Sequence, residues 1–306
     1  MERIDLHSHT QYSDGTSTVE NSLRCAQEEG LAIFSVTDHN TVDAYSELVR
    51  RHDLFSGKLL PGVELSTVFQ GEQIEILGYG FSLPEMEKKI SEHYLPFREK
   101  QIKEAALNVK AVLEKGVVLD PDFVHAMLHC PERIFDPRRQ NNRVFLLAEM
   151  RRHPENHVFF SSREEFEQID RHRFTRDYLF NADSTLYSDQ SSLSPSVDGV
   201  LEIIHSCGGL AFLAHTYVYS KSFLPKLDAL CDHGLDGIEC HYGTFTAEQK
   251  QYLSAYCDAK GLYKSGGSDF HGLDMRPQNL MGLSDGEPIL RELVEPWLHL
   301  VQGRLI

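Results

Sequence analysis

The chain has 306 residues, of which 41% are hydrophobic, so it can bury a full core as one large domain or as a domain with an insertion. Its 46 acidic residues outnumber 30 basic ones, and the net charge of -16 argues against binding long duplex nucleic acid or an anionic membrane surface. The six cysteines contain no Cys-x-x-Cys pair and no stretch approaches the ~18 apolar residues of a membrane span, so we expect a cytoplasmic protein without a zinc ribbon or a disulfide framework.

Residues 4–79 alternate short apolar runs with helical patterns, which favours parallel strands joined by crossover helices. A capping box at 17–20 opens a helix that Gly30 ends, and a second helix is expected over 41–51. The expected strands are followed or ended by residues of metal-ligand type: His7 and His9, Asp38 with His39, Glu64, and Glu75.

Residues 85–190 have a different pattern. Apolar residues from Ile102 to Leu113 follow the 3.6-residue period, charges are dense, and no comparable strand signal appears before a serine-rich segment at 188–196. Alternation then resumes, with expected strands over 210–214, 236–240 and 262–265. We therefore predict an α/β domain in two parts, 1–84 and 191–306, interrupted by a helical subdomain at 85–190.

The later strands also end in potential ligands, namely His215, Glu239, and Asp269 with His271. Each has an ordinary alternative: a lone histidine is commonly a surface residue, Asp14 suits a turn, and Asp269 suits a helix cap. Together they indicate one site, because the carboxyl ends of strands converge on one rim if the strands close into a barrel. A His/Asp/Glu set without cysteine is typical of a catalytic metal site, and it suits zinc, iron or manganese.

Several motifs, in this order and spacing, resemble the PHP (polymerase and histidinol phosphatase) superfamily. They are Asp5-Leu6-His7-Ser8-His9, Ser13-Asp14-Gly15, Thr37-Asp38-His39-Asn40, Pro61-Gly62-Val63-Glu64, Ile76-Leu77-Gly78, Leu213-Ala214-His215 and Gly267-Ser268-Asp269-Phe270-His271-Gly272. The resemblance covers residues 1–82 and 190–275. It is nearest to the branch of bacterial AMP and nucleoside 3',5'-bisphosphate phosphatases, which similarly carry a helical insertion.

The resemblance implies a distorted seven-stranded β/α (TIM-like) barrel that binds two or three divalent ions, with manganese, iron and zinc as candidates and magnesium as a further option. The first ion would be held by His7, His9, Glu64 and Asp269. The second would be held by Glu64 with His215, and the third by Asp14, His39 and His271. Catalytic roles are implied for His7, His9, Glu64, Asp269 and His271, and Asp38 would orient an imidazole.

Glu75 is one departure from the branch, which usually has a histidine just before Ile-Leu-Gly. As a ligand, Glu75 would add negative charge to the second site and favour manganese or iron over zinc. Alternatively it turns away and only two ions bind. We predict that Glu75 is a ligand.

The insertion shows a second departure. The branch usually has Arg-Pro-His there for phosphate recognition, and the nearest match is Arg143-Val144-Phe145. Arg143 is predicted to bind substrate phosphate, with Arg138 or Arg139 as alternatives, although a solvated basic helix face explains them equally well. His241, two residues after Glu239, is predicted to face the same side and to contact a phosphoryl oxygen or the leaving group.

The sequence thus predicts a metal-dependent phosphatase (a hydrolase of class EC 3.1.3.-). Its substrate would be a small phosphomonoester, a nucleotide or nucleoside 3',5'-bisphosphate, attacked by a metal-bridging hydroxide. The alternatives are a 5'-3' exonuclease acting on short oligonucleotides, a histidinol-phosphate phosphatase, and a catalytically inactive metal-binding regulatory module. No oligomeric state is predicted.

Overall fold

The computed structural model describes residues 1–137, 141–220 and 222–306. The chain forms two compact units. The first comprises Met1–Thr67, Ile74–Glu92 and Val197–Ile306, and the second comprises Val68–Gln73 and His93–Ser196. The expected start of the insertion at residue 85 falls inside helix α3 (Leu83–His93), nearly all of which belongs to the first unit.

The first unit contains two main sheets. Strands β1 (Arg3–Asp5), β2 (Leu31–Phe34) and β3 (Lys58–Leu59) form a parallel three-stranded sheet. A five-stranded sheet has the order β4 (Gly62–Phe69), β5 (Glu72–Tyr79), β6 (Leu210–Leu213), β7 (Gly237–Tyr242) and β8 (Tyr263–Gly267). A short antiparallel ribbon pairs β9 (Leu283–Ser284) with β10 (Glu287–Pro288).

These sheets do not close into the single seven-stranded barrel that the sequence predicts. Between the two main sheets, pairing is reduced to isolated parallel bridges, Ser8 with Phe270 and His39 with Glu64. At these positions the backbone leaves the extended conformation, since Asp269 and Asn40 have φ angles of 56° and 53°. The α/β class is as expected, and the interruptions between the sheets fall where the candidate ligands lie.

Strand β5 also differs from the expected parallel arrangement. Its neighbour β4 is reached through only Gln70 and Gly71, whose φ angles of 47° and 79° suit a tight hairpin turn. Strand β5 then runs antiparallel to β6, with Ile76 opposite Leu213. Glu75 therefore lies in the middle of an antiparallel strand, not at the carboxyl end of a parallel one.

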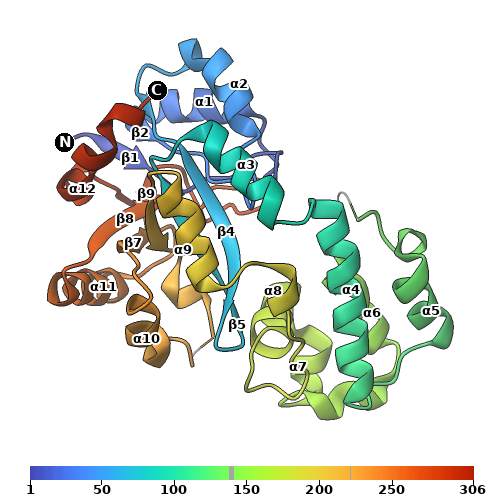
Figure 1. Cartoon of the computed structure of the whole chain (residues 1–306). Helices are drawn as coiled ribbons and strands as arrows, with labels where there is room; N and C mark the ends of the chain where they lie inside the picture. The colour runs from blue at the N-terminus through green and yellow to red at the C-terminus, as the bar shows by residue number, and fades with distance from the viewer. Residues whose placement is uncertain (138–140, 221) are drawn as a thin grey trace. The chain divides into compact units, whose positions relative to one another are not determined.

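Helices pack around the strands of the first unit (Figure 1). They are α1 (Val19–Glu28), α2 (Ala44–Arg50), α9 (Val197–Ser206), α10 (Leu227–Cys231), α11 (Ala247–Lys260) and α12 (Glu295–Val301). The core draws side chains from both main sheets and from α12. At its centre the fully buried Trp297 stacks on Tyr79, with ring centroids 5.7 Å apart, and its indole N–H donates to the Lys264 carbonyl over 2.8 Å.

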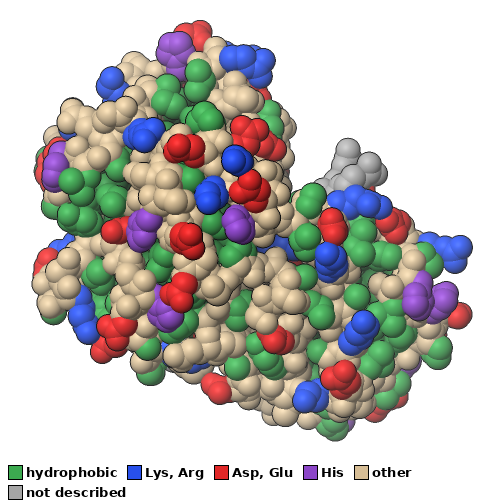
Figure 2. All heavy atoms as spheres, in the orientation of Figure 1, with side chains coloured by type: hydrophobic (Ala, Val, Ile, Leu, Met, Phe, Trp, Pro, Cys, Tyr) green, Lys and Arg blue, Asp and Glu red, His purple; other side chains and the backbone are tan. Residues whose placement is uncertain are grey.

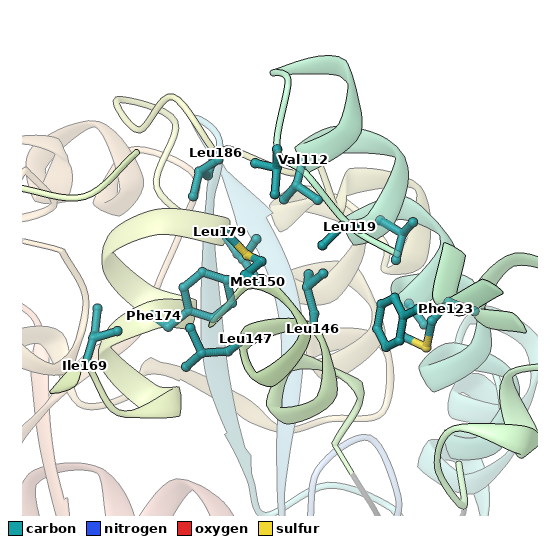
Figure 3. Packing of buried hydrophobic residues seen from close by; sticks show 14 of the residues in the cluster. Val112, Leu119, Phe123, Leu146, Leu147, Met150, Ile169, Phe174, Leu179 and Leu186 are labelled. Atoms are coloured by element: carbon teal, nitrogen blue, oxygen red, sulfur yellow. The ribbon is translucent and has the colours of Figure 1, made fainter. Parts of the chain in front are cut away.

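The second unit has a separate hydrophobic core. Apart from the tip of the β4–β5 hairpin, its described part is helical, with the α-helices α4 (Phe97–Glu114), α5 (Pro121–His129), α6 (Asn142–Arg151), α7 (Arg163–Gln168) and α8 (Arg171–Phe174). Figure 3 shows Val112, Leu146, Met150 and Phe174 converging in this core. Burial of this apolar surface gives the inserted unit its own source of stability.

Two further observations concern the length and polarity of the helices and the charges on one face of the molecule. Within residues 1–137, 141–220 and 222–306, every helix is too short or too polar to cross a bilayer. On the face drawn in Figure 2, lysine and arginine side chains are scattered among acidic ones.

Candidate metal centre

The predicted ligands of the first unit come together in one place. They form a group that we call the histidine-carboxylate cluster: His7, His9, Asp14, His39, Glu64, Glu75, His215, Asp269 and His271. His7 and His9 follow β1, His215 follows β6, and Asp269 and His271 follow β8. Each of these residues therefore lies just beyond the carboxyl end of a strand. His7, His9, Glu64 and His271 are fully buried.

One part of the cluster surrounds the histidines that follow β1. His9 Nε2 lies 3.2 Å from Glu64 Oε2 and 3.1 Å from Asp269 Oδ1. His7 Nε2 lies 3.4 Å and 3.5 Å from the same two oxygens. Two imidazole nitrogens and two carboxylate oxygens therefore point at one position, and that these four residues hold a first ion stays a prediction.

A second part of the cluster contains Glu75. Its Oε2 lies 3.2 Å from His215 Nε2, which is also 2.9 Å from Glu64 Oε1, and its Oε1 lies 3.2 Å from His39 Nδ1. The Tyr219 hydroxyl accepts a hydrogen bond from the Glu75 backbone N–H over 2.9 Å. The carboxylate thus points into the cluster, and the alternative in which Glu75 turns away does not describe this structure.

A third part contains Asp14, whose Oδ1 lies 3.2 Å from His271 Nε2 and 3.6 Å from His39 Nε2. His39 lies between two groups of carboxylates, since its Nδ1 faces Glu64 and Glu75 while its Nε2 faces Asp14. Asp14 therefore acts as more than a turn residue.

The donor atoms of the cluster fit divalent ions. Five of them are buried without a hydrogen-bond partner: His7 Nε2, His9 Nε2, His39 Nδ1, His271 Nε2 and Glu64 Oε2. A buried polar atom left unpaired costs roughly 1–3 kcal/mol, and a bound ion at this spot would compensate several such atoms at once. Nitrogen and oxygen donors without sulfur suit manganese, iron or zinc.

The carboxylates of the cluster favour the protonated form of His9 and His215. Burial opposes the charge on His9, but the neighbouring carboxylates of Asp269 and Glu64 raise its pKa to about 10. Burial likewise opposes the charge on His215, yet Glu64 and Glu75 raise its pKa to about 10. Metal binding must therefore displace protons from these rings.

Strained backbone helps to aim the ligands. His215 and Asp269 have φ angles of 26° and 56°, a left-handed region that residues other than glycine rarely adopt. Such conformations persist where surrounding contacts enforce them, and they concentrate at functional sites. Here they turn the chain at the ends of β6 and β8, where the side chains enter the cluster.

Glu239 positions two ligands. Its Oε1 accepts a hydrogen bond from His7 Nδ1–H over 2.9 Å, and its Oε2 accepts one from the His215 backbone N–H over 2.8 Å. The first bond holds the Nδ1 side of the His7 ring and points Nε2 at the cluster, where it would bind an ion after losing its proton, as in many metal sites.

The orienting role predicted for Asp38 is wrong in its detail. Its carboxylate accepts hydrogen bonds from the Thr10 N–H over 2.8 Å, the Thr10 hydroxyl over 2.6 Å and the Ser13 hydroxyl over 2.5 Å. Asp38 thus fixes the loop that leads from His9 to Asp14, and among the described residues no hydrogen bond or ion pair joins its carboxylate to an imidazole.

The sequence also missed the role of Asp5. This fully buried carboxylate accepts hydrogen bonds from the Ser268 hydroxyl over 2.6 Å and from the backbone N–H groups of His7 and Gly282 over 3.1 Å and 2.7 Å. It therefore joins the end of β1 to the loop that carries Asp269. The sequence did offer a signal for this role, because Asp5 is a charged residue next to the apolar residues Ile4 and Leu6.

The prediction that His241 faces the same side as Glu239 fails because β7 contains a bulge. Glu239 pairs with Ser265 but His241 pairs with Gly266, so the alternation of side chains is broken between them. Tyr242 takes the inward position and donates a hydrogen bond to Asp269 Oδ2 over 2.8 Å. Burial and the nearby Lys250 lower the pKa of His241 to about 4.

Arg143, the other predicted substrate residue, lies on α6 of the second unit. Its Nε donates to Asn141 Oδ1 over 2.8 Å and lies 3.2 Å from Glu104 Oε1, and its guanidinium sits 5.1 Å from the Phe180 ring centroid. These contacts are all within the second unit, so its role with substrate stays a prediction. Arg138 and Arg139 lie outside the described residues.

Arg276 is a cluster neighbour that the sequence reasoning did not single out. Its Nη1 donates to Asp269 Oδ2, so a positive charge lies directly beside a predicted metal ligand. It lies in the loop after β8, seven residues beyond Asp269, where the motif itself offers no indication of its role.

Comparison with known proteins agrees with this geometry. A family model described as the PHP domain matches residues 5–217. A 3',5'-nucleoside bisphosphate phosphatase of Chromobacterium violaceum is 26% identical over 301 residues, which are 96% of this chain and 95% of that protein. A 5'-3' exoribonuclease of Escherichia coli (strain K12) is 26% identical over 289 residues, which are 87% of this chain and 84% of that protein.

Solved structures show the same fold. An amidohydrolase from Chromobacterium violaceum superposes with a TM-score of 0.66 at 21% identity, covering 99% of this chain and 97% of that one. A putative metal-dependent phosphoesterase from Bifidobacterium adolescentis gives a TM-score of 0.62 at 23% identity, covering 98% and 96%.

Proposed function

The chain belongs to the PHP domain family, and from this premise we propose that it is a phosphatase that releases phosphate from a small phosphomonoester, a nucleotide or nucleoside 3',5'-bisphosphate. The family and the homologous enzymes make it a metal-dependent phosphoesterase, a hydrolase that acts on phosphoric ester bonds. What remains to be assigned is the ligand set and the substrate.

The observation that carries the proposal is the set of unpaired buried nitrogen and oxygen atoms in the histidine-carboxylate cluster. We assign His7, His9, Glu64 and Asp269 to a first ion, Glu64, Glu75 and His215 to a second, and Asp14, His39 and His271 to a third. Bound divalent ions lower the pKa of coordinated water and neutralise phosphoryl oxygens, which is the chemistry that ester hydrolysis requires.

The protein's own residues prepare this chemistry by holding the ligands in place. Glu239 keeps the Nε2 of His7 free to bind, while Tyr242 and Arg276 occupy Oδ2 of Asp269 and leave its Oδ1 facing His9. Preformed ligands avoid reorganisation during the reaction, which is the main source of electrostatic catalysis. Glu75 would add a carboxylate to the ligands of the second ion, which would favour manganese or iron over zinc.

The choice of a small monoester is supported by the bisphosphate phosphatase relative, which matches nearly the whole chain. The exoribonuclease relative supports a second candidate, hydrolysis of short oligonucleotides from the 5' end, because the same metal chemistry cleaves diesters. The net charge of -16 disfavours long strands but not short ones.

A substrate panel separates the two candidates. The manganese-loaded protein should be assayed with AMP, adenosine 3',5'-bisphosphate, histidinol phosphate and 5'-phosphorylated oligonucleotides of two to five nucleotides. We expect the highest kcat/KM for a mononucleotide, with inorganic phosphate as product and at least ~10³-fold loss in Asp269→Asn, because a metal ligand is removed. A preference for oligonucleotides with mononucleotide products would replace the phosphatase proposal with the exonuclease.

A further inference from the structure

We propose that Arg276 binds the phosphoryl oxygens of the substrate and is the cationic phosphate clamp of the first unit. This inference rests on the proposed function and adds the residue that recognises the phosphate. It also differs from the sequence-based expectation, which assigned this role to Arg143.

The loop that carries Arg276 is fixed to the cluster. The Arg276 backbone N–H donates to the Gly272 carbonyl over 3.0 Å, and its carbonyl accepts from the Asn279 N–H over 3.0 Å. The Asn279 side chain in turn donates to the Ser268 carbonyl over 2.7 Å. The position of Arg276 is thus tied to the strand end from which Asp269 projects.

The guanidinium is anchored at one end only. Nη1 donates to Asp269 Oδ2, an oxygen that also accepts from the Tyr242 hydroxyl over 2.8 Å. The opposite oxygen, Oδ1, lies 3.1 Å from His9 Nε2 and faces the proposed first ion. Within the described part of the chain, no hydrogen bond engages Nε or Nη2 of Arg276, and 24% of its side chain is exposed.

Lysine and arginine side chains are otherwise scarce beside the histidine-carboxylate cluster. Among the described residues, Arg276 is the one lysine or arginine that forms an ion pair with a member of the histidine-carboxylate cluster. A guanidinium keeps its proton at every pH that proteins tolerate, so Arg276 supplies a permanent positive charge there.

The remaining donors of Arg276 suit a phosphate. A guanidinium presents several N–H groups in a planar fork that matches phosphoryl oxygens, and a lysine ammonium does not reproduce this geometry. Arg143 is less suited, since its Nε already bonds Asn141 and its plane packs over Phe180. Arg276 therefore combines a fixed position, free donors and a place beside the proposed metal ligands.

The test compares Arg276→Met with Tyr242→Phe. Both remove a hydrogen bond to the same Asp269 oxygen, but only the first removes a charge that can reach phosphate. Binding of inorganic phosphate to the manganese-loaded protein should be measured by calorimetry, together with bound manganese per chain, kcat and KM. Arg276→Lys and added guanidinium test whether the planar fork is required.

We expect Arg276→Met to weaken phosphate binding by about 10- to 100-fold, because charge-assisted hydrogen bonds are lost, and to raise KM. Arg276→Lys should recover only part of this loss, and guanidinium should restore phosphate affinity to Arg276→Met. Tyr242→Phe should leave phosphate affinity within about twofold, whatever it does to kcat or metal content.

Unchanged phosphate affinity in Arg276→Met would overturn the assignment. So would equal losses in Arg276→Met and Tyr242→Phe that follow their loss of manganese, since Arg276 would then act only by orienting Asp269. Failure of the wild-type protein to hydrolyse any ester would instead contradict the proposed function, and the calorimetric result distinguishes the two failures because it needs no turnover.

Discussion

Glu239 illustrates how single residues prepare the cluster. It bonds His7 through the side chain and His215 through the backbone, so one carboxylate orients ligands proposed for two different ions. It is fully buried, and among the described residues no lysine or arginine forms an ion pair with it, so its carboxylate is satisfied by these two hydrogen bonds. This arrangement makes Glu239 a positioning residue.

Replacing Glu239 should therefore weaken metal binding without removing a ligand. We expect Glu239→Gln to reduce manganese affinity by about 10- to 100-fold, because the amide accepts the His7 hydrogen bond less strongly and can present a donor instead. Competition against a fluorescent chelator measures this affinity. Glu248→Gln, at an exposed position of α11, is the matched control and should bind manganese as the wild type does.

His241 gives a prediction about pH. Its pKa is lowered to about 4 in the folded protein, so the unfolded chain, with a pKa near 6.5, binds the proton first as pH falls. The contribution of the neutral His241 to the free energy of unfolding is thus fully present above pH ~6.5 and is lost as the pH decreases towards 4. Between pH 7.5 and 5.0 the free energy of unfolding should fall by about 2 kcal/mol for this reason.

His241→Asn should remove this contribution. Measured by urea unfolding, the free energy of unfolding of the variant should fall by about 2 kcal/mol less than that of the wild type between pH 7.5 and 5.0. Between pH 7.5 and 8.5 the difference in this free energy between the two proteins should stay constant. Equal losses in both proteins across the acidic range would show that the burial of His241 beside Lys250 does not control its protonation.

At the scale of elements, the interruptions between strands decide which residues enter the site. The ligand types were visible in the sequence because His7 with His9 and Asp269 with His271 are short-range patterns at the ends of apolar runs. The bulge in β7 was not visible, because it depends on how Glu239 and His241 pair with β8. For the same reason alternation predicted His241 where the structure has Tyr242.

The β4–β5 hairpin shows the same limit. The sequence predicts parallel strands joined by crossover helices over residues 4–79, but the two-residue turn at Gln70 and Gly71 joins β4 directly to β5, which runs antiparallel to β6. The direction of β5 follows from this connection and from its pairing with β6. The local hydrophobic pattern does not indicate strand direction. Glu75 was nevertheless expected as a ligand, and its carboxylate does face His39 and His215.

Close contact between β1 and β8 requires glycine at position 267. A Cβ added there would lie 2.3 Å from both the Cβ and the backbone nitrogen of His7. We expect Gly267→Ala to displace His7 and so reduce manganese affinity by at least ~10-fold as well as lowering the melting temperature.

Gly303→Ala is the control for this variant, since an added Cβ at Gly303 meets nothing within 4 Å. Circular dichroism would establish that Gly267→Ala still folds. Wild-type manganese affinity in the folded Gly267→Ala protein would contradict the view that the contact between β1 and β8 positions His7.

For the molecule as a whole, charge is the main constraint on function. The chain carries a net charge of -16 and gathers the carboxylates of Asp14, Glu64, Glu75 and Asp269 in one cluster, yet the proposed substrate is an anion. Bound divalent ions and Arg276 are the features that reverse the local charge. Binding of ions to the folded state alone also stabilises it, so chelation should lower the melting temperature.

The most direct test of this account is a manganese titration of the chelator-treated protein, in which bound manganese and phosphate release from adenosine 3',5'-bisphosphate are measured in the same samples. We expect no turnover without manganese, activity that rises with the two or three equivalents bound by the cluster, and no activity at any manganese concentration in Asp269→Asn. Turnover that persists in the chelated protein, or that is equal in Asp269→Asn, would contradict the claim that this cluster is a catalytic metal centre.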